Sequence, residues 1–224
     1  MSPEIKHCMV INLSEQHSLM SNWISELRDV NVQADRMRFR KNIERIGEVI
    51  AYEISKTLPW AEKETITPLG NARSKMLSQQ PVLATILRAG SPLHQGMLNY
   101  FDKADNAFIA AYRKHHPDGS FDISLNYMAC PSLTNRVLII ADPMLATGAS
   151  LVKTIGLLQK EGPIAELHIA CVIASREGVN HLLSSVPGVK IWCGDIDKDL
   201  NSKGYIVPGL GDAGDLAFGE KAQS

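Results

Sequence analysis

The sequence predicts an α/β protein in which a mostly parallel sheet is covered by helices on both faces. Short, continuously apolar runs alternate with segments of helical periodicity through the second half of the chain. Such runs are typical of parallel strands that are buried on both faces and joined by crossover helices. The chain has 224 residues and no linker, internal repeat or low-complexity segment. We therefore expect a single domain over residues 1–224.

The N-terminal helical segment, about residues 14–58, carries apolar side chains at helical spacing. The spacing breaks once and begins again at Ala34, which predicts two helices, and Pro59 ends the second one. Residues 60–80 are mixed, and we expect a short strand or arm near Thr65–Leu69.

The second half predicts strands and helices in alternation. Five apolar runs predict buried strands at Val82–Leu87, 106–113, 136–142, 167–175 and 189–194. Between them we expect a helix capped by Ser91, with Pro92 in its first turn. A second helix is expected over 150–161, with Gly162 just past its end.

Two further segments have distinct patterns. Residues 120–128 alternate strictly between polar and apolar, which predicts a half-exposed strand in a projecting β-arm. From Asp195 to about residue 218 the sequence is glycine-rich, which predicts a loop.

Composition and charge bear on the class of partner. The 23 basic and 24 acidic residues give a formal net charge of -1, which does not favour nucleic acid. The basic cluster DRMRFRK, residues 35–41, is interpreted as a solvated or intersubunit face, with a nucleic-acid patch as the alternative. No apolar run approaches the roughly 18 residues of a membrane span. The four cysteines form no Cys-x-x-Cys pair, which indicates buried free thiols, and we expect a cytoplasmic protein.

Charged residues follow four of the predicted strands, at Arg88, Arg113, Asp142 and the pair 176–177. The carboxyl ends of parallel strands meet at one edge of a sheet, where ligands bind, so we expect these side chains to face one site. Each of them alone could equally be a surface charge. Their shared position is therefore the stronger signal.

The loop after Asp142 predicts a phosphate-binding site. The small residues 147–150 stand just before a helix, so backbone amides and the positive end of the helix dipole can meet a phosphate. Asp142 can accept hydrogen bonds from sugar hydroxyls, and the two arginines can bind further phosphate oxygens. We expect a sugar phosphate with more than one anionic group. The alternative is a tight strand-to-helix turn without a ligand.

Two familiar nucleotide-binding motifs do not apply. The sequence contains no Gly-x-x-x-x-Gly-Lys-Ser/Thr, which excludes a P-loop kinase or GTPase. Gly209, Gly211 and Gly214 match Gly-x-Gly-x-x-Gly, but only ten residues follow, too few for the rest of a dinucleotide-binding unit. We interpret these glycines as part of a loop whose backbone contacts a small flat ligand.

Two long motifs resemble those of a known family. VLIIADPMLATGAS, residues 137–150, resembles the phosphoribosyl-pyrophosphate loop of type I phosphoribosyltransferases, and its proline after Asp142 marks the uracil phosphoribosyltransferase branch. GYIVPGLGDAGD, residues 204–215, resembles the uracil-binding segment of that branch. ILRAG and AYR match its two arginine stations, and FRKNIERIGEVIAYE is similar to its N-terminal helix. The resemblance runs from about residue 30 to Lys221.

The resemblance implies the type I phosphoribosyltransferase fold and the transfer of phosphoribosyl from 5-phosphoribosyl-1-diphosphate to uracil, giving UMP and pyrophosphate in pyrimidine salvage. It also implies a homodimer or higher homo-oligomer, and magnesium held through the substrate's pyrophosphate, with no residue directly assigned as a metal ligand. The implied catalytic residues are Asp212, Arg88 and Arg113. The residues implied to bind the phosphoribosyl substrate are Arg88, Arg113, Asp142, Pro143, Met144, Leu145, Ala146, Thr147, Gly148, Ala149, Ser150 and Asp212. Those implied to bind uracil are Tyr205, Ile206, Gly211, Asp212 and Ala213, and residues around 114–127 would form an arm over the site.

Three positions depart from the family pattern, and two other functions stay open. Ala149 stands where the family usually has glycine, Arg176 where it has proline, and Leu216 where it often has a charged residue. A positive φ at Ala149 would strain the loop. The alternatives are a regulatory or binding protein of this fold with little turnover, and a related enzyme that uses another base.

Overall fold

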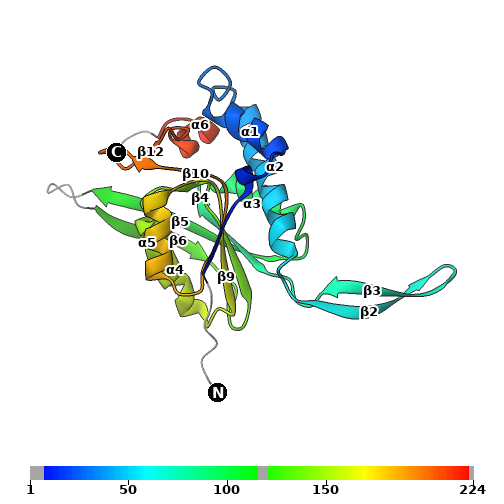
Figure 1. Ribbon diagram of the computed structural model, residues 1–224. Coiled ribbons are helices and arrows are strands. Elements are labelled where there is room, and N and C mark those ends of the chain that lie inside the picture. Colours follow the sequence, from blue (N-terminus) through cyan, green and yellow to red (C-terminus); the bar gives the residue numbers. More distant parts are fainter. Residues whose placement is uncertain (1–7, 116–120, 222–224) are drawn as a thin grey trace.

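The computed structural model describes residues 8–115 and 121–221, with 111–115 and 121–126 described as backbone only. Its centre is a sheet in the order β1-β10-β9-β7-β4-β5-β6 (Figure 1), in which every neighbouring pair is parallel except β5 and β6. The strands of this path are β1 (Met9–Asn12), β4 (Val82–Leu87), β5 (Asp105–His115), β6 (Phe121–Ala129), β7 (Val137–Ala141), β9 (Glu166–Ser175) and β10 (Lys190–Asp197). The predicted mostly parallel sheet is confirmed, and β1 is an addition that the sequence pattern did not indicate.

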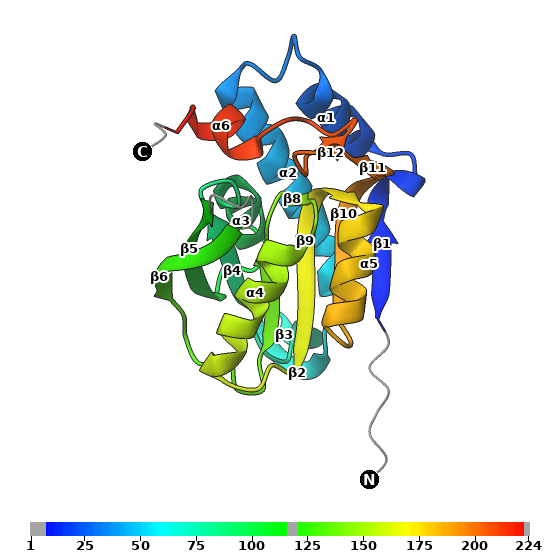
Figure 2. The ribbon, with the colours of Figure 1, turned by 90° about the vertical axis from the view of Figure 1, so that its left-hand side faces the viewer.

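Helices cover both faces of this sheet, as predicted. The helices are α1 (Leu19–Arg28), α2 (Arg36–Ser55), α3 (Ser91–Leu98), α4 (Ala149–Leu158), α5 (Arg176–Ser185) and α6 (Ala213–Phe218), with 3-10 turns at Leu13–Glu15 and Gln159–Glu161. In Figure 2, α4 and α5 lie on the face toward the viewer and α2 lies behind the strands. Alternate residues of each strand feed two apolar cores. Ile139 belongs to the core under α1–α3, whereas its neighbour Ile140 belongs to the core under α4 and α5.

The C-terminal region is more ordered than the predicted loop. β10 extends to Asp197, and β11 (Asp199–Leu200) pairs with β12 (Ile206–Val207) before α6 begins. Figure 1 shows β12 and α6 beside α1 and α2, and Ile206 and Ala213 belong to the same core as those helices. The prediction of a loop was wrong in this respect, because glycines mark the turns but do not show the short elements between them.

A second hairpin projects from the molecule where only a short strand or arm was expected. β2 (Trp60–Thr67) and β3 (Gly70–Leu77) pair antiparallel over their whole length and extend away from the sheet in Figure 1. Nearly every residue of both strands is exposed. The strand predicted over 120–128 is β6, which pairs antiparallel with β5 at the edge of the main sheet.

One predicted helix cap is wrong, and one helix begins a residue earlier than predicted. Ser91 is the first residue of α3 rather than its cap, because the chain already turns at Gly90, and its hydroxyl donates to the Arg88 carbonyl instead. Ser150 lies inside α4, whose cap is Gly148, and its carbonyl accepts a hydrogen bond from Thr154. Gly162 does end the helical stretch.

The cysteines differ in burial. All four cysteines are free; Cys171 and Cys193 are buried as predicted, but Cys8 is exposed and Cys130 is half-buried. Within the described part of the chain, no helix is both long and apolar enough to cross a membrane.

Candidate active site

The predicted site residues lie where parallel strands end. Arg88 follows β4, Asp142 follows β7, and the β9–α5 junction begins at Ser175. β4 is parallel to β5 and β7, and β7 is parallel to β9, so these ends share one edge of the sheet. Arg113 lies in β5, but its side chain is outside the described part of the structure.

The phosphate loop, residues 142–150, is shaped by its contacts with β9. The carbonyl of Pro143 accepts hydrogen bonds from the amides of Val172 and Ile173 at 3.0 and 3.1 Å. The next two residues form β8 (Met144–Leu145), which pairs with β9. This pairing directs residues 146–148 toward the start of α4.

The turn into α4 has the features of an anion site. Gly148 has a φ of 75° and caps the helix, so the left-handed conformation falls on a glycine. Ala149 is already helical, and the strain expected from its methyl group does not arise. The first amides of α4 point out of the helix end without a preceding carbonyl to bind, as in every helix. The amide of Ala149 makes only a long hydrogen bond, 3.4 Å, to Oγ1 of Thr147, so this end of the helix is suited to an anion.

Three residues that the sequence did not single out hold this loop from behind. The buried Ser175 hydroxyl donates to the Ala146 carbonyl at 2.6 Å and accepts from the Gly178 amide at 2.9 Å. A Cβ atom at Gly178 would lie 2.1 Å from the Ala146 carbonyl oxygen, so only glycine fits this close approach. His181 Nδ1 lies 2.8 Å from the Thr147 carbonyl. The charged pair 176–177 marked this strand end in the sequence, but it did not indicate these contacts.

Asp142 and Arg88 occupy different positions at the sheet edge. Asp142 is half-buried, and its Oδ1 accepts a hydrogen bond from the Met144 amide at 3.3 Å, which keeps the side chain at the mouth of the loop. Arg88 pairs with Asp215 at 3.1 Å and donates to the Gly219 carbonyl at 3.3 Å. Arg88 therefore connects the sheet edge to α6.

The predicted uracil-binding residues surround the turn before α6. Ile206 and Ala213 are buried, whereas Tyr205 is partly exposed. Gly211 has a φ of 94°. Asp212 caps α6, and its Oδ1 accepts a hydrogen bond from the Asp215 amide at 3.0 Å. Asp212 thus has a capping role, and a cap does not exclude a second role.

The C-terminal segment approaches the sheet edge at two points, one of which lies in the phosphate loop. A Cβ atom at Gly204 would lie 3.8 Å from Cγ2 of Thr147. A Cβ atom at Gly214 would lie 3.8 Å from Cβ of Ala89, in the turn after β4. The structure therefore brings the two long motifs together, although they are about 60 residues apart in the chain.

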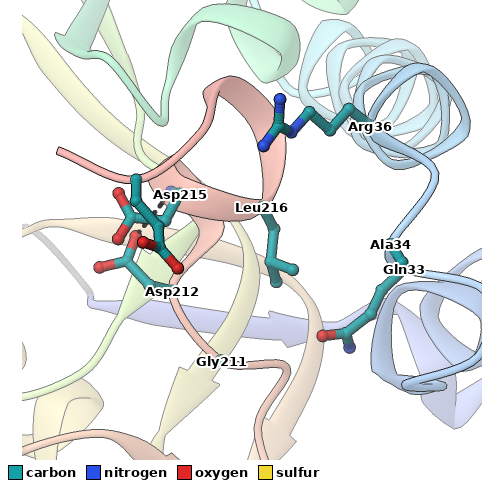
Figure 3. A pocket seen from close by; sticks show the side chains of 8 residues that line it. Gln33, Ala34, Arg36, Gly211, Asp212, Asp215 and Leu216 are labelled. Atoms are coloured by element: carbon teal, nitrogen blue, oxygen red, sulfur yellow. Dashed lines mark hydrogen bonds between the residues drawn. The ribbon is translucent and has the colours of Figure 1, made fainter.

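A cavity of about 370 Å³ opens beside Asp212 (Figure 3). Its walls come from both ends of the chain, and its lining residues are Gln33, Ala34, Arg36, Gly211, Asp212, Asp215, Leu216 and Glu220. Figure 3 shows Gln33 on the connection between α1 and α2 and Arg36 at the start of α2, across from Asp212. The basic cluster 35–41 thus contributes to this cavity through Arg36, rather than forming only a solvated face.

Metal-binding side chains do not gather in the described residues: no group of three or more histidines, cysteines or carboxylates could hold an ion there. Magnesium is commonly bound by one or two carboxylates together with substrate phosphates. The residues present fit that arrangement, because Asp142 and Asp212 lie in the motifs that flank the site.

Comparison with known proteins decides the family. The family model described as uracil phosphoribosyltransferase matches residues 14–220. The chain belongs to the uracil phosphoribosyltransferase family. It is 50% identical over 213 residues to a uracil phosphoribosyltransferase of Porphyromonas gingivalis, which covers 95% of this chain and 99% of the relative.

Solved structures agree with the fold of this family. The AQ2163 protein from Aquifex aeolicus superposes with a TM-score of 0.84 at 30% identity, over 94% of this chain and 98% of that chain. A hypoxanthine phosphoribosyltransferase from Staphylococcus aureus superposes with a TM-score of 0.50 at 15% identity, over 83% and 84% of the two chains. The second likeness concerns the fold alone, and it confirms the predicted phosphoribosyltransferase architecture.

Proposed function

We propose that the chain transfers the phosphoribosyl group of 5-phosphoribosyl-1-diphosphate to uracil, giving UMP and pyrophosphate, as a step of pyrimidine salvage. The observation that carries this proposal is the meeting of the two motifs. A helix N-terminus suited to the 5-phosphate lies beside the glycine-rich segment suited to the base, with Gly204 next to Thr147. One nucleotide can reach both parts of such a site.

The reaction forms a bond between N1 of uracil and C1′ of ribose and breaks the bond from C1′ to the pyrophosphate oxygen. The pyrophosphate leaves with the bonding electrons, and the N1 proton is lost. The chain's contribution is to align the two reactants and to stabilise charge as it develops. In our proposal the amides of residues 147–150 bind the 5-phosphate, Asp142 the ribose hydroxyls, and Arg88 and Arg113 the pyrophosphate.

The C-terminal segment supplies the specificity for the base. Uracil presents alternating acceptors and donors along its edge, and the backbone of Ile206 and of 211–213 can pair with them. Tyr205 would shape the open side of this pocket. A base with a different pattern would leave buried polar groups unpaired, which is strongly unfavourable. Asp212, at the start of α6, would favour the cationic sugar of the transition state over the ground state.

Magnesium enters this proposal with the substrate. When bound to the pyrophosphate, it would neutralise part of the charge of the leaving group. Asp142 and Asp212 are the carboxylates that could hold its water ligands. The free state of all four cysteines fits a reducing compartment, so we also propose a cytoplasmic location.

We further propose a homodimer or higher homo-oligomer in which the β2–β3 hairpin packs against a second copy. An isolated two-stranded hairpin is at best marginally stable in water, and this one exposes Ile66 by 86% and Leu69 by 99%. Light scattering after size-exclusion chromatography tests this proposal with Ile66→Asp. We expect the parent to be an oligomer and the variant to shift toward the monomer. A monomeric parent, or a variant that keeps the oligomeric mass of the parent, would contradict the proposal.

Pyrophosphate release from 5-phosphoribosyl-1-diphosphate tests the main proposal directly. Uracil, cytosine, hypoxanthine and orotate are supplied in turn with magnesium. We expect turnover with uracil and little with the other three. Turnover with a different base would favour a related enzyme of the superfamily, and no turnover with any base would favour a binding or regulatory protein.

A further inference from the structure

Arg28, the last residue of α1, binds the C-terminal end of β10 with an extended set of hydrogen bonds. Its two terminal nitrogens donate to both carboxylate oxygens of Asp197, at 2.7 and 2.9 Å. One of them also donates to Asp195 at 2.9 Å. Arg28 is 19% exposed and Asp197 only 7%, so the fork is largely removed from water.

The same fork holds the backbone of Gly209. The Gly209 carbonyl accepts from Arg28 at 2.9 Å, and its amide donates to Asp197 Oδ2 at 3.1 Å. Both polar groups of one peptide residue are thus bound by the two members of a single ion pair. Gly209 stands between Ile206 and Gly211, two residues of the proposed uracil pocket.

The backbone conformation at this contact requires glycine. Gly209 has a φ of 60°, and a Cβ atom there would lie 2.1 Å from the Ile206 carbonyl oxygen. The turn therefore depends on glycine for its shape and on outside contacts for its placement. Burial alone would lower the pKa of Arg28, but the carboxylates of Asp197 and Asp195 outweigh it and raise that pKa. The guanidinium consequently stays charged at any working pH.

We infer that Arg28 and Asp197 are positioning residues for the base: together they fix the backbone of residues 206–211 in the conformation that reads uracil. The inference rests on the proposed function. Neither residue needs to touch the substrate, because each acts through Gly209. The pair belongs to no motif that the sequence singled out.

Lysine cannot replace Arg28 in this role. The guanidinium makes four hydrogen bonds to three residues in a planar fork, whereas an ammonium group has three donors and no fork. Arg28→Lys keeps the charge and removes the geometry. It is therefore the sharpest variant for separating positioning from simple charge balance.

Arg38→Lys is the matched control. Arg38 also forms a two-bond fork that involves α1, since its Nε and a terminal nitrogen donate to Glu26 at 2.8 and 2.6 Å. This fork connects α2 to α1 and does not involve the C-terminal segment. Any general effect of loosening the N-terminal helices should appear in both variants.

Steady-state kinetics of the full chain, at a temperature well below each melting point, test the inference. For Arg28→Lys we expect the KM for uracil to rise about tenfold or more, because a charge-assisted contact on the base segment is lost. The KM for 5-phosphoribosyl-1-diphosphate should stay within about twofold, and Arg38→Lys should change neither. Asp197→Asn, which keeps the side chain's shape, should reproduce the effect on uracil and provides a second variant if Arg28→Lys does not fold.

Three results would overturn the inference. The first is an unchanged KM for uracil in a folded Arg28→Lys variant with a lower melting temperature. The second is an equal rise in both KM values, and the third is the same shift in Arg38→Lys. Failure of the proposed function is distinguishable, because the parent chain would then show no turnover with uracil before any variant is compared.

Discussion

The phosphate side and the base side of the site are supported in different ways. The phosphate loop is held by β9 and α5. Ser175 of β9 hydrogen-bonds the Ala146 carbonyl, and His181 of α5 hydrogen-bonds the Thr147 carbonyl. The base segment is held by arginines of the N-terminal helices, Arg28 on Gly209 and Arg40 on Ala217. Ser175 and Ala146 are 29 residues apart in the chain, whereas Arg28 and Gly209 are 181 apart.

This difference indicates which changes should affect which substrate. Supports of the phosphate loop come from β9 and α5, which follow the loop closely in the chain, so their loss should weaken binding of the phosphoribosyl substrate. Supports of the base segment come from α1 and α2, so their loss should weaken binding of uracil. Asp212 and Arg88 lie between the two sides and are expected to affect turnover rather than one substrate alone.

The largest effect is expected for Asp212→Asn. Asparagine can still cap α6 by accepting the Asp215 amide, so the fold of the segment should persist while the charge is lost. We expect kcat to fall on the order of a hundredfold, with both KM values changed much less, because the charge acts on the transition state. Steady-state kinetics and a melting curve measure the two parts. Near-normal turnover would mean that Asp212 is only a cap.

Arg88→Ala tests the connection between the two sides. The variant removes a guanidinium from the proposed pyrophosphate site and also its pair with Asp215. A charge-assisted hydrogen bond contributes roughly 1.5–3 kcal/mol, so we expect a loss of about ten- to hundredfold in kcat/KM for 5-phosphoribosyl-1-diphosphate. Asp215→Asn is the control, because it removes the pair but keeps the arginine. Activity within twofold of the parent would make Arg88 a surface charge.

Gly148→Val should weaken the phosphate side alone. Gly148 has a φ of 75°, which strains a branched side chain, and a Cβ atom there would lie 3.1 Å from the Gly178 carbonyl oxygen, so the loop that presents the amides must shift. We expect the Kd for 5-phosphoribosyl-1-diphosphate to rise about tenfold in calorimetry. Gly156→Ala in α4 is the matched control: nothing lies within 4 Å of its Cβ position, and it should stabilise the helix by about 0.5–1 kcal/mol. An unchanged affinity in Gly148→Val would remove the loop from the site.

The smallest effect concerns a region away from both sides. Glu166 lies 2.6 Å from His168 Nε2 and also contacts Lys190, and these contacts lower the pKa of Glu166 to about 2. The stabilisation is present above the unfolded pKa of about 4.5 and is lost as the pH falls toward 2. Glu166→Gln should therefore flatten the acid side of the stability profile, by on the order of 1 kcal/mol after solvent screening.

Thermal unfolding at pH 5 and pH 3 measures this effect. The KM values of Glu166→Gln for uracil and for the phosphoribosyl substrate should match those of the parent at neutral pH. A change in either KM would show that the sheet beneath the site, and not only its two supports, controls binding.

Much of the fold followed from local sequence patterns. The strand at Val82–Leu87 was predicted with its observed bounds, because a buried parallel strand is a continuous apolar run. β1 was missed since MVIN is short and becomes a strand only through its pairing with β10. The β2–β3 hairpin was reduced to a short arm because its strands bury almost nothing and so have no clear apolar alternation.

The site was predictable on one side only. Asp142 and Gly148 could be placed because a strand, an acid and a small-residue turn follow one another in the chain. Arg28 and Arg40 could not, because an arginine in an amphipathic helix has the same sequence pattern whether it faces water or a carbonyl far along the chain. Likewise, Ser91 is a reasonable cap by composition, but the preceding turn at Gly90 begins the helix one residue earlier.

A crystal structure of the chain with UMP would test the whole site most directly, because one ligand spans both sides. We predict that the phosphate oxygens lie within hydrogen-bond distance of the amides of residues 147–150. The edges of uracil should meet the backbone of Ile206 and of 211–213, with Gly209 still held by Arg28 and Asp197. A phosphate bound away from the start of α4, or a base bound against Gln33 and Arg36 instead, would contradict the account.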